Sequence, residues 1–99
     1  MIVVYEDDDA RLVQDQAPTG EVILHCKVYR WSSGVYKKLL TALINKVISC
    51  KIVYAPAVDC KQIKFMEMFG FVVSDKEMID QNGEKHSLYQ MGVEQWKAH

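Results

Sequence analysis

The chain has 99 residues, of which 49% are hydrophobic and 25% are charged, and its net charge is −1. This length and composition predict one globular domain whose core needs no metal or disulfide staples. The near-neutral charge excludes a general attraction to nucleic acid or to anionic membranes, and no apolar run approaches the roughly 20 residues that cross a bilayer.

Three strands are predicted in the first third of the chain. Residues 2–5 are β-branched and aromatic, and after the acidic turn at 6–9 the chain returns as a strand over 10–14 to make a hairpin. A turn at 17–20 leads to a strand over 21–29 in which side chains alternate. Apolar residues on both sides at its start indicate a central strand that is covered on both faces.

A long amphipathic helix follows these strands. Residues 32–34 open it, and apolar residues between 35 and 48 recur at the i, i+3, i+4 and i+7 positions of one face. Residues 52–55 form a short buried strand, which Pro56 is expected to end because proline cannot donate to the ladder of a sheet.

The second half of the chain predicts a short helix and a hairpin. The helix spans 60–69 and is followed by Gly70, at the position where a left-handed residue commonly closes a helix. Residues 71–79 and 85–91 form two strands that are joined by the turn at 80–83.

The predicted order of elements is β-β-β-α-β-α-β-β. This order defines a mixed α+β sheet in a single domain over 1–99, and two successive strand–helix–strand units imply parallel pairing near its middle. The tail over 92–99 carries Trp96 and receives no assigned structure.

The segment from Asp59 to Phe71 has the residue pattern of a short, capped helix that leads into a strand. An acidic residue caps the helix, Phe65 lies on its apolar face, and Gly70-Phe71 closes it. The pattern resembles the late helix of the GNAT family of N-acetyltransferases, whose typical form is Asn-x-x-Ala-x-x-Phe-Tyr-x-x-x-Gly-Phe. The resemblance implies a truncated GNAT-like fold without the family's first strand and two helices, which usually shape the side of the acceptor substrate.

The same resemblance implies that acetyl-CoA or CoA binds at the start of the long helix. GNAT proteins hold the CoA pyrophosphate on backbone amides of a Gln/Arg-x-x-Gly-x-Gly/Ala loop, where the helix dipole also favours an anion. Here Gly34 fits the first glycine, while Trp31 and Tyr36 replace the usual Gln/Arg and small residue. The implied cofactor-binding residues are Val28, Tyr29, Ser32, Ser33, Gly34, Val35, Tyr36, Lys37, Asp59 and Phe65. The alternative is that Ser32 or Ser33 is a helix N-cap and that Tyr36 fills the pocket.

Transfer of an acyl group to an amine needs a base for the ammonium and an acid for the leaving thiolate. The family's usual tyrosine acid is replaced by Met66, whose thioether transfers no proton and whose spacing also suits a core residue. His25 is a candidate base near the splayed strands of the family, with a structural, hydrogen-bonded histidine as the alternative. Tyr54 is a candidate acid among several tyrosines that the spacing does not separate. His25 and Cys26 point to opposite faces of a strand, so they form no nucleophile–base dyad.

The cysteines and histidines indicate neither a disulfide framework nor a metal site. Cys26, Cys50 and Cys60 are odd in number and contain no CxxC motif, which favours a reducing, cytoplasmic setting. His86 and His99 have no metal-ligand spacing to any cysteine, so we expect no metal.

Two function classes fit these features. The leading hypothesis is a minimal GNAT-like protein with weak or lost catalysis that acts through protein contacts, for which Trp31 and Trp96 are candidate anchors, or through a homo-oligomer. In this it resembles the short, divergent GNAT-like proteins of tailed phages, some of which serve virion assembly or host takeover, in the host cytoplasm or the virion. The alternative is an acyl-CoA-dependent N-acetyltransferase that acts on a small amine or a protein lysine. An unrelated α+β binding module is a third possibility, and no basic patch favours a nucleic-acid partner.

Overall fold

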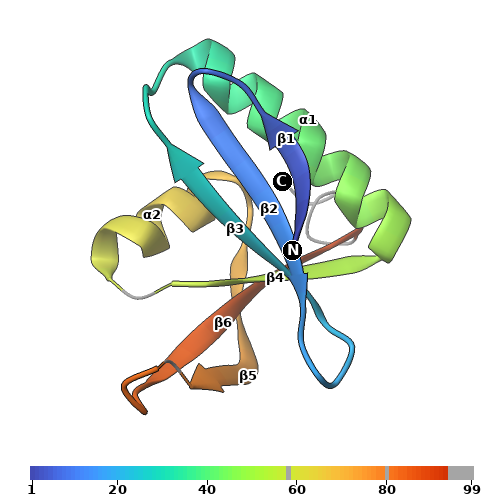
Figure 1. Ribbon diagram of the computed structural model, residues 1–99, viewed down its shortest axis with the longest axis vertical. Helices are drawn as coiled ribbons and strands as arrows, with labels where there is room; N and C mark the ends of the chain where they lie inside the picture. Colours follow the sequence, from blue (N-terminus) through green and yellow to red (C-terminus); the bar gives the residue numbers. More distant parts are fainter. Residues whose placement is uncertain (58, 80, 94–99) are drawn as a thin grey trace.

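The computed structural model describes residues 1–57, 59–79 and 81–93. These residues form one six-stranded sheet and two helices (Figure 1). The elements are β1 (Ile2–Glu6), β2 (Ala10–Gln16), β3 (Val22–Val28), α1 (Ser33–Cys50), β4 (Ile52–Pro56), α2 (Cys60–Met68), β5 (Val72–Ile79) and β6 (Lys85–Gly92). The order of the elements confirms the predicted mixed α+β fold.

The strands lie in the order β1-β2-β3-β4-β6-β5 across the sheet. The unit β3-α1-β4 gives the predicted parallel pair at the centre, and every other neighbouring pair is antiparallel within the described chain. The second unit gives no parallel neighbours, because β6 returns between β4 and β5 and pairs with both. The pattern of strand, helix and strand therefore predicts the β3-α1-β4 crossover correctly. It does not predict that β6 inserts between β4 and β5.

Most predicted element ends differ from the observed ones by one or two residues, and two of these differences bear on the sheet. Pro56 is itself the last residue of β4 and pairs with Leu88 of β6, so the strand ends at the proline and not before it. Pairing of β4 with β3 has stopped by this residue, so the strand has an open side there, and proline is tolerated at open edges. Gly92 belongs to β6, so the predicted tail starts too early; residues 94–99, and with them Trp96, lie outside the described residues.

Both helices pack on the same face of the sheet. Their side chains enclose the main core together with those of the sheet residues Leu12, Leu24, Val53, Ala55 and Met91. The opposite face carries a smaller buried cluster of Ile23, Tyr54 and Leu88. The central strand β3 is therefore covered on both faces at its start, as predicted, where Ile23 and Leu24 are buried, whereas Cys26 and Lys27 toward its end are exposed.

The short helix α2 is fixed at both ends. Its N-cap Asp59 accepts a hydrogen bond from the Gln62 N–H at 2.8 Å. At the other end Gly70 has φ 93°, and the N–H groups of Gly70 and Phe71 donate to the carbonyls of Glu67 and Met66. This pair of bonds is the Schellman motif, which confirms the predicted left-handed closure at Gly70.

Candidate functional site

The parallel strands β3 and β4 separate soon after they meet. Within the described chain their register holds the single pair Ile23↔Tyr54, although β3 stays paired with β2 from end to end. Figure 1 shows the two strands diverging toward the side on which α2 lies. Beyond Ile23, the edge of β3 that faces away from β2 therefore has no register partner among the described residues.

A groove of about 350 Å³, here called the split groove, lies at this opening. Its walls include His25, Cys26, Pro56, Phe65, Met66 and His86. These residues come from β3, β4, α2 and β6, which are far apart in the sequence. The separation of the two strands thus brings polar, sulfur-containing and aromatic side chains together around exposed backbone.

His25 stands at the wall of the split groove with a carboxylate beside it. Its Nε2 lies 3.5 Å from Oδ2 of Asp15, and both side chains are slightly more than a third exposed. The two residues face each other diagonally across the β2–β3 pair, because His25 pairs with Val13 and Asp15 pairs with Ile23. A carboxylate in this place orients the imidazole, which can then accept a proton at the groove wall.

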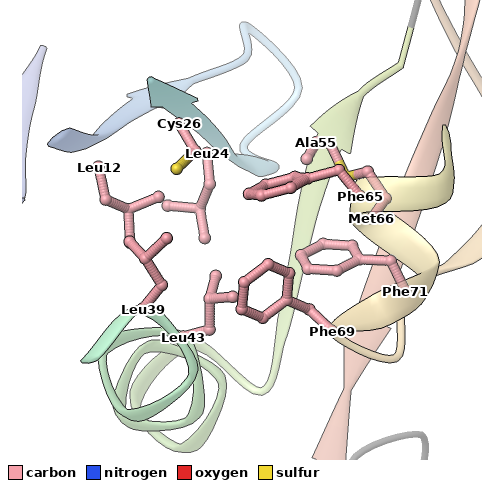
Figure 2. A pocket seen from close by; sticks show the side chains of 10 residues that line it. All are labelled: Leu12, Leu24, Cys26, Leu39, Leu43, Ala55, Phe65, Met66, Phe69 and Phe71. Carbon is pink, nitrogen blue, oxygen red and sulfur yellow. The ribbon is translucent and has the colours of Figure 1, made fainter. Parts of the chain in front are cut away.

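Cys26 points to the other side of β3. Its sulfur is directed toward the apolar interior between the sheet and the helices (Figure 2), although the residue as a whole is exposed. Burial raises the pKa of the thiol to about 11. Because a nucleophile must be a thiolate, Cys26 is a neutral lining residue near pH 7 rather than a reactive one.

A small apolar hollow, here called the inner cavity, lies beneath the split on the side of the helices. Its volume is about 30 Å³, and Figure 2 shows the side chains that surround it. Leu24, Cys26, Phe65 and Met66 line both the inner cavity and the split groove. These four side chains form the boundary between the two spaces.

A third space, here called the outer groove, continues from the split groove along the end of β3. Its volume is about 580 Å³, and its walls include Val28, Tyr29, Arg30, Trp31, Lys61 and Lys64. Three of these side chains are cationic, and the Arg30 side chain is 82% exposed even though its Nε lies 3.8 Å from Oδ1 of Asp9. The outer groove can therefore receive an anionic group, and guanidinium and ammonium groups are the usual protein ligands of phosphate.

The sequence did not single out Lys61 and Lys64. They are three residues apart on α2, and from the sequence alone they are typical of solvent-exposed lysines on a helix face. Only the packing of α2 beside the end of β3 brings them to Arg30, and the three-residue spacing on one face was the one signal in the sequence.

The loop that was predicted to cradle phosphate is built as a helix cap. The Ser32 hydroxyl accepts a hydrogen bond from the Val35 N–H at 3.2 Å, and α1 begins at Ser33. The Val35 side chain is buried in the core, whereas Lys37 is exposed. A Cβ at Gly34 would make an ordinary contact of 3.6 Å with the Ser32 Oγ, so the helix start itself does not require glycine there.

An aromatic cluster joins this loop to α2. The Trp31 ring lies edge-on to Tyr36, Phe65 and Phe69, with centroids 6.3, 5.7 and 6.4 Å away. The Tyr36 hydroxyl donates a hydrogen bond to the Met68 carbonyl at 3.2 Å. Tyr36 is thus turned toward α2, and Phe65 lines both the outer groove and the split groove.

Tyr54 and His25 occupy different surroundings. Tyr54 is 6% exposed and packs with Ile23 and Leu88 on the face away from the helices, with the Lys76 Nζ 5.9 Å from its ring centre. Met66, which stands where the GNAT pattern has a tyrosine, is half-buried between the split groove and the inner cavity. The structure therefore places His25, but not Tyr54, at the split groove.

Neither a metal centre nor a membrane span is found in the described residues. They contain no group of three or more His, Cys, Asp or Glu side chains that could hold an ion. Neither helix is long and apolar enough, over the residues searched, to cross a membrane.

No known family model matches this chain. No curated protein is significantly similar to it in sequence.

Proposed function

We propose that this chain is a minimal GNAT-like protein that binds an acyl-CoA type of thioester along the split between β3 and β4, and in which catalysis is weak or lost. One observation carries the proposal: the outer groove, the split groove and the inner cavity follow one another, and Phe65 lines all three. The spaces change in that order from cationic to mixed to apolar.

The ligand has the same order of chemical groups. Its phosphates suit Arg30, Lys61 and Lys64 of the outer groove. The amide-containing arm that follows can pair with the free backbone edge of β3, as an added strand does. The thioester then reaches the split groove beside His25 and Met66. In this proposal the phosphates lie against side chains of α2 and of the loop after β3. At the helix start, Ser32 already accepts a hydrogen bond from one of the amides.

Weak catalysis follows from the residues at the inner end. Met66 has no proton to give to a leaving thiolate, and Tyr54 lies in the small apolar cluster on the opposite face. The protein would then act through contacts with a protein partner or a second copy. Exposed apolar side chains on both edge strands support such contacts, since Ile2 of β1 is 61% and Val73 of β5 is 60% exposed.

A second candidate is an acyl-CoA-dependent N-acyltransferase that acts on a small amine or a lysine. The observation that favours it is the His25–Asp15 pair at the wall of the split groove. An imidazole in this position could deprotonate an incoming ammonium, with solvent protonating the leaving thiolate.

Calorimetric titration of the intact chain with CoA and acetyl-CoA tests the proposed binding. Lys61→Gln and Lys64→Gln should each weaken binding about fivefold, which corresponds to roughly 1 kcal/mol for one hydrogen-bonded, partly exposed charge. Lys85→Gln, an exposed lysine at the start of β6, is the matched control and should leave the affinity unchanged. Absence of any heat at millimolar ligand would contradict the proposal.

The two candidates differ in turnover. Acetyl-CoA is incubated with the chain and a polyamine or a lysine peptide, and acetylated product is measured by mass spectrometry. Binding without product supports the weakly catalytic protein, whereas product that disappears in His25→Gln with CoA affinity retained supports the transferase.

A further inference from the structure

The inner cavity differs from the two grooves in its almost wholly apolar lining. It lies between α1, α2 and the strands β2 to β4, and the 10 side chains around it are aliphatic, aromatic or sulfur-containing (Figure 2). A water molecule in such a space needs two to four polar partners, and the polar side-chain group here is the neutral thiol of Cys26. An apolar occupant therefore suits the cavity better than water does.

The inner cavity adjoins the split groove. Leu24, Cys26, Phe65 and Met66 line both spaces, so a movement of one of these side chains is enough to let an alkyl chain pass from one to the other. Met66 is half-buried, and its unbranched thioether side chain adapts its shape to a neighbour at low cost. Met66, which stands where the GNAT pattern has a tyrosine, thus also lies at the boundary between the split groove and the inner cavity.

We propose that the inner cavity receives the end of a short linear alkyl chain, so that the preferred thioester carries an acyl group longer than acetyl. This inference rests on the proposed binding of an acyl-CoA thioester along the split. The cavity volume of about 30 Å³ corresponds to roughly two groups of methylene size, since about 10–15 Å³ holds one water-sized probe. The best fit is therefore an acyl chain of about four carbons.

We expect the affinity for the acyl-CoA to rise with the length of the acyl chain up to about four carbons and to rise no further beyond that. Each buried methylene should tighten binding about fourfold, so butyryl-CoA should bind roughly fifteenfold more tightly than acetyl-CoA. Octanoyl-CoA should gain nothing further, because its remaining carbons exceed the cavity.

The test is a calorimetric series with CoA, acetyl-CoA, butyryl-CoA and octanoyl-CoA on the intact chain. An optimum at butyryl-CoA supports the inference. Equal affinity for all four ligands overturns it while the proposed function stands. Absence of binding by any of them overturns the proposed function, and the inference with it.

Matched variants locate the effect in the cavity. Leu43→Phe fills the space and should abolish the preference for butyryl-CoA while CoA affinity is retained. Leu40→Phe, the same change on the same helix at a half-buried residue that packs against the core without lining the cavity, should keep the preference. Leu43→Ala should enlarge the space and move the optimum to a longer chain. An unchanged optimum in both Leu43 variants overturns the inference.

A probe that needs no thioester tests the cavity directly. Xenon binds dry apolar cavities, so under xenon pressure the NMR methyl signals of Leu24 and Leu39 should shift in the unmodified chain and stay fixed in Leu43→Phe. Unperturbed signals in the unmodified chain would show that the cavity admits no apolar guest, which overturns the inference whatever the outcome of the titrations.

Discussion

Replacing Phe69 by leucine should destabilise the protein by about 2 kcal/mol. Phe69 is 1% exposed, and its ring lies 5.0 Å from those of Tyr36 and Phe65 and 6.4 Å from that of Trp31. Aromatic pairs of this kind contribute about 0.5–1.5 kcal/mol each beyond the area that they bury. Leucine keeps most of the buried area but loses all three ring pairs, whose energies overlap because they share one ring.

Phe71→Leu is the matched control for this prediction. Phe71 is 5% exposed in the same core, and none of the ring pairs found among the described residues includes it. Its replacement should cost about 1 kcal/mol, as size-conserving core changes do. Urea unfolding followed by circular dichroism measures both changes, and the expected difference of about 1 kcal/mol corresponds to roughly 4–8 °C in Tm. Equal losses in the two variants would refute a stabilising role for the aromatic cluster.

Three other predictions concern the caps and one carboxylate. Lys51→Gly should raise the free energy of unfolding by about 1 kcal/mol in urea titrations, because Lys51 follows α1 with φ 71°, a conformation that costs a side chain energy. Ser32→Ala should lower it by about 1 kcal/mol through loss of the N-cap bond, whereas Ser33→Ala should change it little in the same assay. The hydrogen bond from the Thr19 hydroxyl lowers the pKa of Glu21 from 4.5 to about 2. Since the pKa of Glu21 is depressed in the folded state, its ionised carboxylate stabilises the fold fully above about pH 4.5, and this stabilisation is lost as the pH falls toward 2. Glu21→Gln should therefore make the free energy of unfolding less dependent on pH in that range. Urea midpoints measured between pH 5 and 2 test this.

The elements of the fold follow from local features of the sequence. Leu39, Leu43 and Val47 are spaced for one face of a helix, and all three are buried in α1. Gly70 closes α2 as expected because a left-handed residue is needed there. Sheet order is less local: β6 lies between β4 and β5, and no residue pattern within Lys85–Gly92 specifies that it pairs with β4.

The candidate site was only partly predictable for the same reason. His25 was identified because it lies on the central strand, and Val28, Tyr29 and Phe65 do line the outer groove. The sequence did not predict that Lys61 and Lys64 belong to the site, because they line the same groove as Arg30 only once α2 has packed beside the end of β3. The alternation of β4 does place Tyr54 on the face opposite to that of its neighbours Val53 and Ala55.

The position of a bound thioester tests the proposal most directly. Backbone amide signals of the isotope-labelled chain are followed by NMR during a titration with CoA. Binding along the split predicts the largest shifts in residues 24–28 of β3, with smaller shifts at Lys61 and Lys64 and none over Ile2–Glu6 of β1. Shifts that are confined to β1, or an unchanged spectrum at millimolar CoA, would contradict it.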